Sequence, residues 1–345
     1  MKIVVDGCGN DLGSLIMMQG AEMAVKEIDG LEILLTGDEH TLGALALENG
    51  INLRSIHLMQ ADSILTMEDS PMSIMEDRKD SSMAKGFELL KSGEGEAFVS
   101  AGNTGALLTG SSLLAGRLKG VKRAGIATTL PTRKGSQYVL MDAGANVECR
   151  AEMLVQFALM ASVYAETMGI EHPRVGIINN GTEHHKGTPL VKETYALLQK
   201  APIHFIGSVE GKELNNDGCD VAITDGFTGN VVLKTTEGVG KAFGGMLKDG
   251  ILNGGFRAKL GYALLKPTLK SVFSKVDASE VGGAPLLGIA YPVIKAHGGS
   301  DARAVKNAIL QASKMCQMSI NDRITEKMEQ WKSVKKEEGA TTAHE

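Results

Sequence analysis

The chain alternates short apolar runs with amphipathic helical segments over most of its length. The runs with strand character cover residues 3–5, 33–35, 56–59, 97–100, 125–128, 138–141, 174–178, 204–206 and 221–224. Helical periods fill the gaps between them, most clearly over 151–168. Alternation of this kind predicts a mostly parallel sheet with helices on both faces. At 345 residues the chain is long for one core but fits one two-lobed α/β unit or two domains.

Composition narrows the functional classes. A net charge of −5 and an aromatic content of 4% argue against nucleic-acid binding, which uses basic surfaces and aromatic stacking. The four cysteines are far apart, so neither a zinc site nor a disulfide framework is predicted. No run of 18 apolar residues occurs, and the N-terminus resembles a strand rather than a signal peptide. These features predict a cytoplasmic globular protein.

The loops that follow the strands are rich in glycine and short polar residues. In 98–108 an apolar strand leads into Gly102, Asn103, Thr104 and Gly105, and a helix begins directly afterwards. Backbone N–H groups and the positive end of a helix dipole would meet there, which suits an anion such as phosphate. Similar loops follow four other strands, at 6–11, 142–146, 179–187 and 225–230. Because ligands bind at the carboxyl ends of parallel strands, the five loops predict one shared anion site.

Other catalytic motifs are incomplete or absent. The stretch after the first strand has Gly7 and Gly9 but lacks the third glycine of a dinucleotide fingerprint. Neither a P-loop nor the serine elbow of α/β-hydrolases occurs. Cys149 has no partner histidine implied by the sequence, so a buried structural thiol is favoured over a nucleophile.

Two basic residues, one in the 179–187 loop and one near residue 300, have more than one possible role. Lys186 could pair with phosphate or be a solvated lysine. His297, followed by Gly298 and Gly299, could be a general acid or a packing histidine.

A basic segment stands out in this acidic chain. Residues 241–275 contain seven lysines and arginines and one acid, Asp249. Apolar residues recur there at helical spacing, and Pro267 is expected to divide the segment into two short helices. A basic amphipathic pair of helices predicts a surface for anionic lipid or an acidic partner, with a plain packed hairpin as the alternative. The residues after 325 are polar and predict a frayed tail.

Together these motifs resemble the phosphate acyltransferase family of bacterial phospholipid synthesis. The matching segments follow the family's order over residues 1 to about 315, and are 79–83, 100–107, 142–146, 181–187, 225–235, 282–288 and 297–304. The chain departs from the family pattern at 6–11, which reads Asp-Gly-Cys-Gly-Asn-Asp, and at Gly299, where serine is usual.

The resemblance implies a three-layer α/β/α fold of the isocitrate and isopropylmalate dehydrogenase type with a protruding amphipathic helical hairpin. It divides the chain into a two-lobed catalytic unit (1–325), a basic protrusion within it (241–277) and a polar tail (326–345). It also implies a homodimer without metal or organic cofactor that associates peripherally with the inner face of the cell membrane.

The implied reaction moves a fatty acyl group from an acyl-carrier-protein (ACP) thioester to inorganic phosphate. The acyl phosphate would serve a downstream glycerol-3-phosphate acyltransferase. Two alternatives remain: a phosphotransacetylase-like enzyme that uses acyl-CoA, and a catalytically silent membrane-binding scaffold.

We assign roles to the family positions as hypotheses. The catalytic candidates are Lys186, Asn230 and His297. The phosphate- or substrate-binding candidates are Asp6, Ser100, Gly102, Asn103, Thr104, Gly105, Asn146, Asp225 and Ser300. The membrane- or ACP-contacting candidates are Arg257, Lys259, Leu260, Leu264, Lys266 and Lys270. Phosphate is already an oxyanion nucleophile at neutral pH, so no covalent acyl-enzyme is required.

Overall fold

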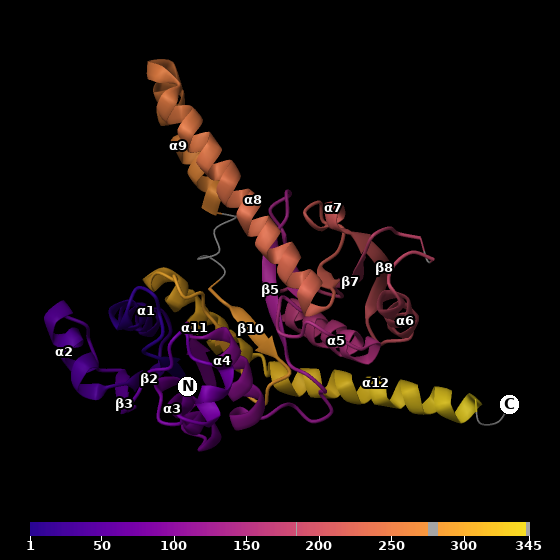
Figure 1. Ribbon diagram of the computed structural model, residues 1–345, viewed down its shortest axis with the longest axis horizontal. Helices are drawn as coiled ribbons and strands as arrows, with labels where there is room; N and C mark the ends of the chain where they lie inside the picture. Colours follow the sequence, from indigo (N-terminus) through magenta and orange to yellow (C-terminus); the bar gives the residue numbers. More distant parts are fainter. Residues whose placement is uncertain (184, 275–281, 343–345) are drawn as a thin grey trace.

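The computed structural model describes residues 1–183, 185–274 and 282–342 and contains one mixed sheet (Figure 1). The sheet has eleven strands in the order β3-β2-β1-β4-β11-β10-β5-β6-β9-β7-β8. The strands are β1 (Lys2–Asp6), β2 (Glu32–Gly37), β3 (Ile56–Gln60), β4 (Ala97–Ser100), β5 (Gly125–Pro131), β6 (Gln137–Met141), β7 (Arg174–Asn179), β8 (His204–Glu210), β9 (Val221–Ile223), β10 (Ala284–Leu287) and β11 (Val293–Lys295). All nine runs with strand character form strands, whereas β10 and β11 are additional to them.

Helices fill most of the connections between strands. They are α1 (Ser14–Glu27), α2 (Glu39–Asn49), η1 (Pro71–Met75), α3 (Ser82–Lys91), α4 (Thr104–Gly110), η2 (Ser111–Ala115), α5 (Ala151–Thr167), α6 (Pro189–Leu198), α7 (Gly211–Leu214), α8 (Gly226–Asn253), α9 (Gly255–Ser274), α11 (Ala302–Gln317) and α12 (Ile320–Thr342).

Strand direction divides the sheet into two parallel blocks. Strands β3, β2, β1, β4 and β11 are parallel to one another, as are β6, β9, β7 and β8. Between the blocks, the pairings β11–β10, β10–β5 and β5–β6 are all antiparallel. Three reversals leave the two blocks running in opposite directions. The strand ends therefore form two sets rather than the single row that the sequence predicts.

Alternate side chains of each strand enter different cores, as the pleat requires. Ile3 and Val5 belong to the largest core, under α1, α5, α11 and α12, whereas Val4 belongs to a second core under α3 and α4. A third core, around Tyr138 and Leu140, covers the same face as the second in the other block. Helices thus cover both faces, and the three-layer α/β/α fold is confirmed.

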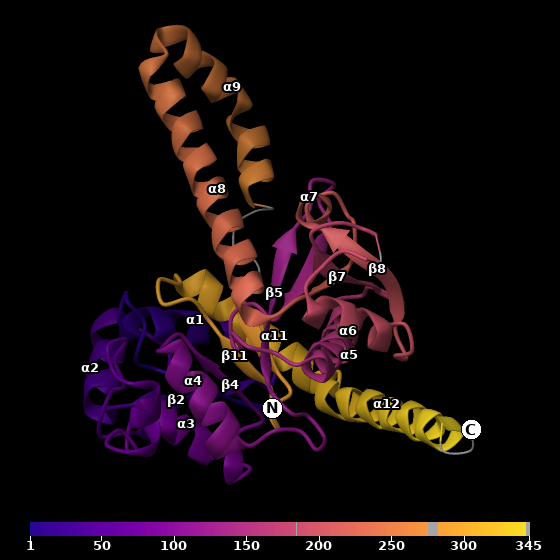
Figure 2. The same ribbon diagram turned by 45° about the vertical axis from the view of Figure 1, so that its right-hand side comes forward.

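Helices α8 and α9 form a hairpin that projects from the sheet between the two halves of the molecule (Figures 1 and 2). The expected break at Pro267 is wrong, because α9 continues through it. The chain turns instead at Gly254 and Gly255, where Gly255 has a φ of 71° that favours glycine. Residues 275–277 of the predicted protrusion lie outside the described residues. Within the described chain, every helix is too short or too polar to cross a bilayer.

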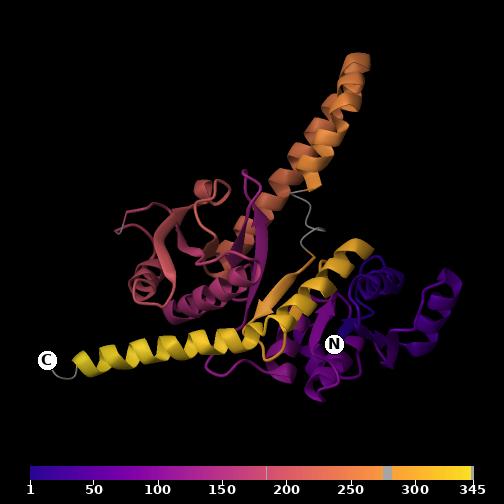
Figure 3. The same ribbon diagram turned by 180° about the vertical axis from the view of Figure 1, so that it is seen from behind.

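The C-terminal segment differs from the expected frayed tail. Helix α12 runs to Thr342 as one rod along one side of the molecule, and its C-terminal end extends past the rest of the fold (Figure 3). Met328 is 2% exposed and Trp331 is 4% exposed, and both belong to the core that holds α5. The expectation of a frayed tail is therefore wrong for 326–342, which is polar in sequence but helical, and which is docked through Met328 and Trp331. A few apolar side chains on a polar helix suffice to dock it.

Candidate active site

A buried carboxylate lies at the end of β1. Asp6 is 1% exposed and accepts hydrogen bonds from the hydroxyls of Ser82 and Ser100, each at 2.7 Å. The backbone N–H of Cys8 donates to it at 3.2 Å. Burial raises the pKa of Asp6, and these hydrogen bonds oppose the shift. Ser100 also accepts from the N–H of Gly102 at 3.0 Å, so Asp6 and Ser100 together fix the turn after β4.

Lys295, the last residue of β11, contacts the turn after β4 that Asp6 and Ser100 fix. Its Nζ donates to the carbonyl oxygens of Ala101 (at 2.8 Å) and Gly102. Burial lowers the pKa of Lys295 to about 8, and the charges of Asp6 and Asp11 oppose the shift. We refer to Asp6, Ser82, Ser100, Gly102 and Lys295 as the Asp6 group.

The loops after β1 and β11 meet beside the Asp6 group. The N–H of Asp11 donates to the carbonyl of Gly298 at 2.9 Å, and the Asn10 side chain donates to the carbonyl of Ser300 at 3.2 Å. His297 is exposed, and its Nδ1 accepts from the N–H of Gly299 at 3.0 Å. A neutral His297 in this geometry carries its proton on Nε2, which can act as a donor.

Helix α4 begins at the Asp6 group. Asn103 caps this helix by accepting from the N–H of Ala106, and its amide donates to the carbonyls of Thr66, Met67 and Asp69. Asn103 therefore clamps the 66–69 segment over the helix start. Thr104 is exposed, Gly105 is partly buried, and a side chain at Gly105 would meet Pro71 at 2.6 Å. The backbone at the start of α4 thus lies against the neighbouring loop.

A second buried carboxylate organises the loop after β6. Asp142 is 0% exposed and accepts from the N–H groups of Ile126, Gly144, Ala145 and Asn146. The Asn146 amide donates to Asp142 and to the carbonyl of Ala124, each at 2.8 Å. Burial raises the pKa of Asp142, and this set of donors opposes the shift. Asn146 thus holds the loop in shape.

Helix α8 begins directly against this loop. A Cβ at Gly229 would lie 1.9 Å from the carbonyl oxygen of Asp142, and one at Gly226 would lie 2.5 Å from that of Asn146. Asp225 caps the helix by accepting from the N–H of Thr228 at 2.8 Å. Asn230 is exposed, one turn into the helix, and borders Gly144. Glycines 226 and 229 therefore allow the helix N-terminus to reach the loop.

The starts of α4 and α8 lie over the same face of the sheet. Ala143, in the loop that α8 contacts, is buried in one core with Ala106 and Leu107 of α4. Leu233 of α8 packs against that core. The first turns of α4 and the loop that α8 contacts therefore share one core on this face, despite the reversed strand directions.

Lys186 lies in the loop after β7, close to Glu183. Its Nζ is 2.8 Å from Glu183 Oε1, and this ion pair lowers the pKa of Glu183. The side chain of Lys186 also fills the space beside Gly181, where a Cβ would be 2.4 Å from Lys186 Cδ. An exposed pair of this kind is worth little energy, so an anionic ligand could displace Glu183. His184 lies outside the described residues.

The cysteines are poor nucleophiles at neutral pH. Burial raises the pKa of Cys8, Cys149 and Cys316 to about 11 and that of Cys219 to about 12. A thiol that stays protonated does not attack an acyl group.

The predicted membrane- or ACP-contacting residues lie on α9. Arg257, Lys259, Leu260, Leu264 and Lys266 are all exposed, and the side chain of Lys270 lies outside the described residues. Leu264 is 76% exposed, so the hairpin presents apolar as well as basic groups to its surroundings.

Sequence reasoning missed Ser82, Asp142 and Lys295 as site residues. Ser82 follows a helix-capping serine, Ser81, and reads as an ordinary helix start. Asp142 follows an apolar strand, as Asp6 does, and that parallel could have identified it. Lys295 follows Val293 and Ile294 and lies two residues before His297. This position would have indicated a site residue only if 293–295 had been recognised as a strand.

Solved structures with a similar fold include phosphotransacetylases and 4-hydroxythreonine-4-phosphate dehydrogenases. A phosphotransacetylase from Streptococcus pyogenes superposes with a TM-score of 0.63 over 92% of this chain and 94% of its own, at 16% identity. A 4-hydroxythreonine-4-phosphate dehydrogenase from Klebsiella pneumoniae gives a TM-score of 0.52 over 92% and 99%, at 13% identity. At such identities the likeness concerns the fold, which is of the phosphotransacetylase and dehydrogenase-like type.

Sequence comparison identifies the family. The family described as "Fatty acid synthesis protein" matches residues 1–323. The Phosphate acyltransferase of Alkaliphilus oremlandii is 43% identical over 327 residues, 94% of this chain and 97% of that protein. The Phosphate acyltransferase of Bacillus licheniformis is 42% identical over 331 residues, 96% and 99% of the two chains. The chain therefore belongs to the phosphate acyltransferase family.

Proposed function

We propose that the protein is a phosphate acyltransferase that moves a fatty acyl group from an ACP thioester to inorganic phosphate for phospholipid synthesis. The observation that carries the proposal is the 43% identity to a protein of that name over nearly the whole of both chains. The start of α8 against the 142–146 loop supports it, because Ala143 of that loop shares a core with the start of α4.

The reaction needs positioning more than a strong base. A phosphate oxygen attacks the thioester carbonyl carbon, a C–O bond forms and the C–S bond breaks. The ACP thiolate leaves with the electron pair and takes up one proton. The raised pKa values of the four cysteines favour this direct transfer over a cysteine acyl-enzyme.

We place phosphate and the thioester between the starts of α4 and α8. Thr104 and Asn230 are exposed there, whereas Asn103, Asn146 and Asp225 hold the two helix starts in place. Asp6, Ser100 and Gly102 act in the same indirect way, through the turn at Ala101 and Gly102.

His297 donates a hydrogen bond from Nε2 to the departing thiolate, and the thiolate takes up the proton that hydrogen phosphate gives up as acyl phosphate forms. Its Nδ1 is held by the N–H of Gly299, which leaves the other ring nitrogen as the donor. Ser300 is buried and orients this loop through the bond from Asn10 to its carbonyl.

Lys186 binds phosphate after releasing Glu183. Lys186→Ala should raise the KM for phosphate about tenfold or more while the KM for acyl-ACP stays near that of the wild type. Glu183→Gln is the matched variant, since it leaves the lysine without its partner and should lower the KM for phosphate. An unchanged KM for phosphate in Lys186→Ala would remove this lysine from the site.

The remaining expectations extend the proposal to the cell. We propose a homodimer in the cytoplasm whose hairpin contacts the inner face of the membrane through residues of 241–277, with Arg257, Lys259 and Lys266 near the anionic head groups or the acidic carrier. Exposed lysines and leucines on α9 support this contact. The acyl phosphate would pass to a glycerol-3-phosphate acyltransferase.

The direct test mixes the protein, palmitoyl-ACP and phosphate, and measures hydroxylamine-reactive acyl phosphate. We expect product from palmitoyl-ACP and none when phosphate is left out. Product from acetyl-CoA but not from palmitoyl-ACP would favour a phosphotransacetylase-like enzyme. Vesicle binding without product from either donor would identify a catalytically silent scaffold.

A further inference from the structure

A pocket lies at the N-terminal ends of β7 and β8. It is a cavity of about 370 Å³. Four segments line it: the end of α5, the turn before β7, the turn before β8, and α12. Helix α5 packs against both α6 and α12, so one core holds these segments together (Figures 1 and 2). The polar residues of the lining are Ser162, Glu166, His172, His204 and Lys327.

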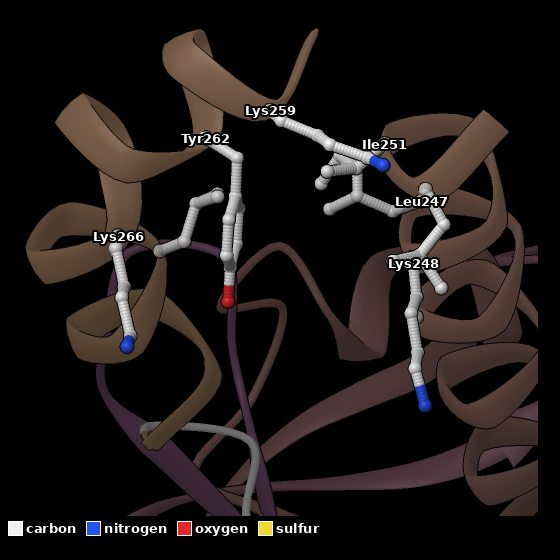
Figure 4. Close-up of a pocket in the computed structure, with 9 residues that line it drawn as sticks. Leu247, Lys248, Ile251, Lys259, Tyr262 and Lys266 are labelled. Atoms are coloured by element: carbon white, nitrogen blue, oxygen red, sulfur yellow. The ribbon is translucent and has the colours of Figure 1, made fainter. Parts of the chain in front are cut away.

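The pocket is separate from the two surfaces that already have a role. Lys186 follows the carboxyl end of β7, whereas Pro173 of the pocket precedes the first residue of that strand. The six residues of β7, about 20 Å of extended chain, lie between them. The facing sides of α8 and α9, which carry Leu247 and Tyr262 (Figure 4), share no residue with the pocket.

A buried hydroxyl in this pocket has no protein partner. Ser162 of α5 is 2% exposed and lines the cavity. Among the residues that the structure describes, none forms a hydrogen bond with this hydroxyl. Later in the same helix, the hydroxyl of Thr167 donates to the carbonyl of Tyr164 at 2.6 Å, which is the usual arrangement for a buried hydroxyl. The Ser162 hydroxyl is therefore available to a molecule in the cavity.

The charged groups around the pocket leave a positive excess. Glu166, the lining carboxylate, forms an ion pair with Arg323 of α12. Lys327, one turn later on α12, is partly buried and forms no ion pair with another described residue. His204 donates from Nδ1 to the carbonyl of His172 at 3.4 Å, and no described residue bonds to the His172 ring. One ammonium group and two imidazoles therefore line the cavity without a free carboxylate to balance them.

The end of α5 leaves few acceptors for a cation. The N–H groups of residues 168–170 donate to the carbonyls of Ala165 and Glu166 at 3.0–3.2 Å. Within the described part of the chain, no three His, Cys, Asp or Glu side chains are placed to hold a metal ion. Free donors thus outnumber free acceptors in the pocket, which favours an anion over a cation.

We propose that this pocket binds a small phosphate monoester. The phosphate contacts the Lys327 amine and the Ser162 hydroxyl, and the organic part lies on the apolar wall formed by Pro173, Pro202 and Ile203. A phosphate monoester carries about 1.5–2 negative charges at pH 7, so it gains more than a carboxylate from an ammonium beside two imidazoles. The bound ester would join α5 to α12. This site goes beyond the proposed acyl transfer and does not depend on it.

The test uses the full chain, labelled with ¹³C at Cε1 of its eight histidines and titrated with phenyl phosphate. The NMR resonances of His172 and His204 are assigned with His172→Gln and His204→Gln. Both should shift together and saturate with one Kd in the wild type. The resonance of His297 reports separately on the candidate active site, so binding there is distinguished from binding in the pocket.

Matched variants test the two polar contacts. Lys327→Gln should weaken binding about tenfold and Ser162→Ala about threefold, because they remove a charge-assisted and a neutral hydrogen bond. Lys336→Gln changes an exposed lysine of the same helix, and Ser313→Ala changes a buried helical serine outside the pocket. Both controls should bind like the wild type. Circular dichroism and thermal unfolding check that each variant is folded.

Any of the following results would overturn the proposal. The first is that millimolar phenyl phosphate leaves the His172 and His204 resonances unmoved. Equal affinity for inorganic phosphate would show that the organic part is not recognised, and equal or tighter binding of benzoate would show a carboxylate site. An equal response to benzyl alcohol would show an apolar crevice without recognition of an anion. Equal affinity in Lys327→Gln and Lys336→Gln would remove the lysine contact.

Discussion

Lys295 is a cation that the fold places where water is scarce. It contacts two backbone carbonyls at the turn after β4 and lies near Asp6. Removing such a lysine deletes the donors that hold the turn and leaves Asp6 without the nearby positive charge. The site therefore depends on a residue that we do not expect to touch the reacting atoms.

The pKa of Lys295 leads to a testable pH dependence. Between pH 8 and the ordinary lysine value of 10.5, the unfolded chain keeps a proton that the folded chain has released. The contribution of Lys295 to the free energy of unfolding of the wild type therefore rises with pH in this window. The free energy of unfolding of the wild type, minus that of Lys295→Met, should increase there by on the order of 3 kcal/mol. Urea unfolding at several pH values measures it, and parallel curves would contradict the prediction.

Single residues of the Asp6 group show what sequence can and cannot reveal. Asp6 and Ser100 end apolar strands beside glycines, so their place near a ligand loop was predictable. Their pairing with Lys295 was not, because it joins positions 6, 100 and 295 through β4 and β11, and a strand of only three residues leaves almost no periodic signal.

At the level of elements, α8 contains two glycines with different surroundings. Gly229 faces the carbonyl of Asp142, whereas Gly238 has open space around it. Gly229→Ala should push the helix start away from the loop, lower the free energy of unfolding by about 2 kcal/mol and reduce turnover by about tenfold or more.

Gly238→Ala is the matched control on the same helix. With nothing in the way of the new methyl group, it should raise the free energy of unfolding by about 0.5–1 kcal/mol and leave turnover unchanged. Chemical denaturation and the acyl phosphate assay give both quantities. Equal losses in the two variants would show that packing against Asp142 is not the cause.

The position of the turn between α8 and α9 was not predicted by the local preferences of proline and glycine. A proline inside a helix removes one hydrogen bond and favours a break, so Pro267 predicted a turn. The chain instead turns at Gly254 and Gly255, where a positive φ is available without strain. Glycine pairs are common in this glycine-rich chain, so the sequence alone did not single out this one.

At the level of the whole molecule, α12 ties the C-terminus to the core that holds α5. Trp331→Ala should lower the free energy of unfolding by about 3 kcal/mol, because a large buried side chain is lost. Gln330→Ala, at the exposed neighbouring position, should change it by less than about 0.5 kcal/mol. Thermal or urea unfolding measures both changes. A decrease in the free energy of unfolding of under 1 kcal/mol in Trp331→Ala would show that the helix is only loosely docked.

The three-layer fold was predictable because nine strands carry clear apolar runs separated by helical periods. The reversal between the two blocks was not, since it depends on β10 and β11, whose short sequences lie among glycines and a proline. The predicted site residues therefore fall into two sets, at the strand ends of the two blocks, and the order along the chain does not reveal that α4 and the loop after β6 share one core.

The insertion of β11 beside β4 also has a consequence for how the protein is made. β4 lies at residues 97–100, and the strand that covers its edge, at 293–295, is made only after the whole of the other block. Until then a nascent chain exposes the unpaired N–H and C=O groups of a buried strand in the middle of the future sheet. The complete eleven-stranded sheet therefore cannot form until residue 295 has left the ribosome, long after the N-terminal block has been made.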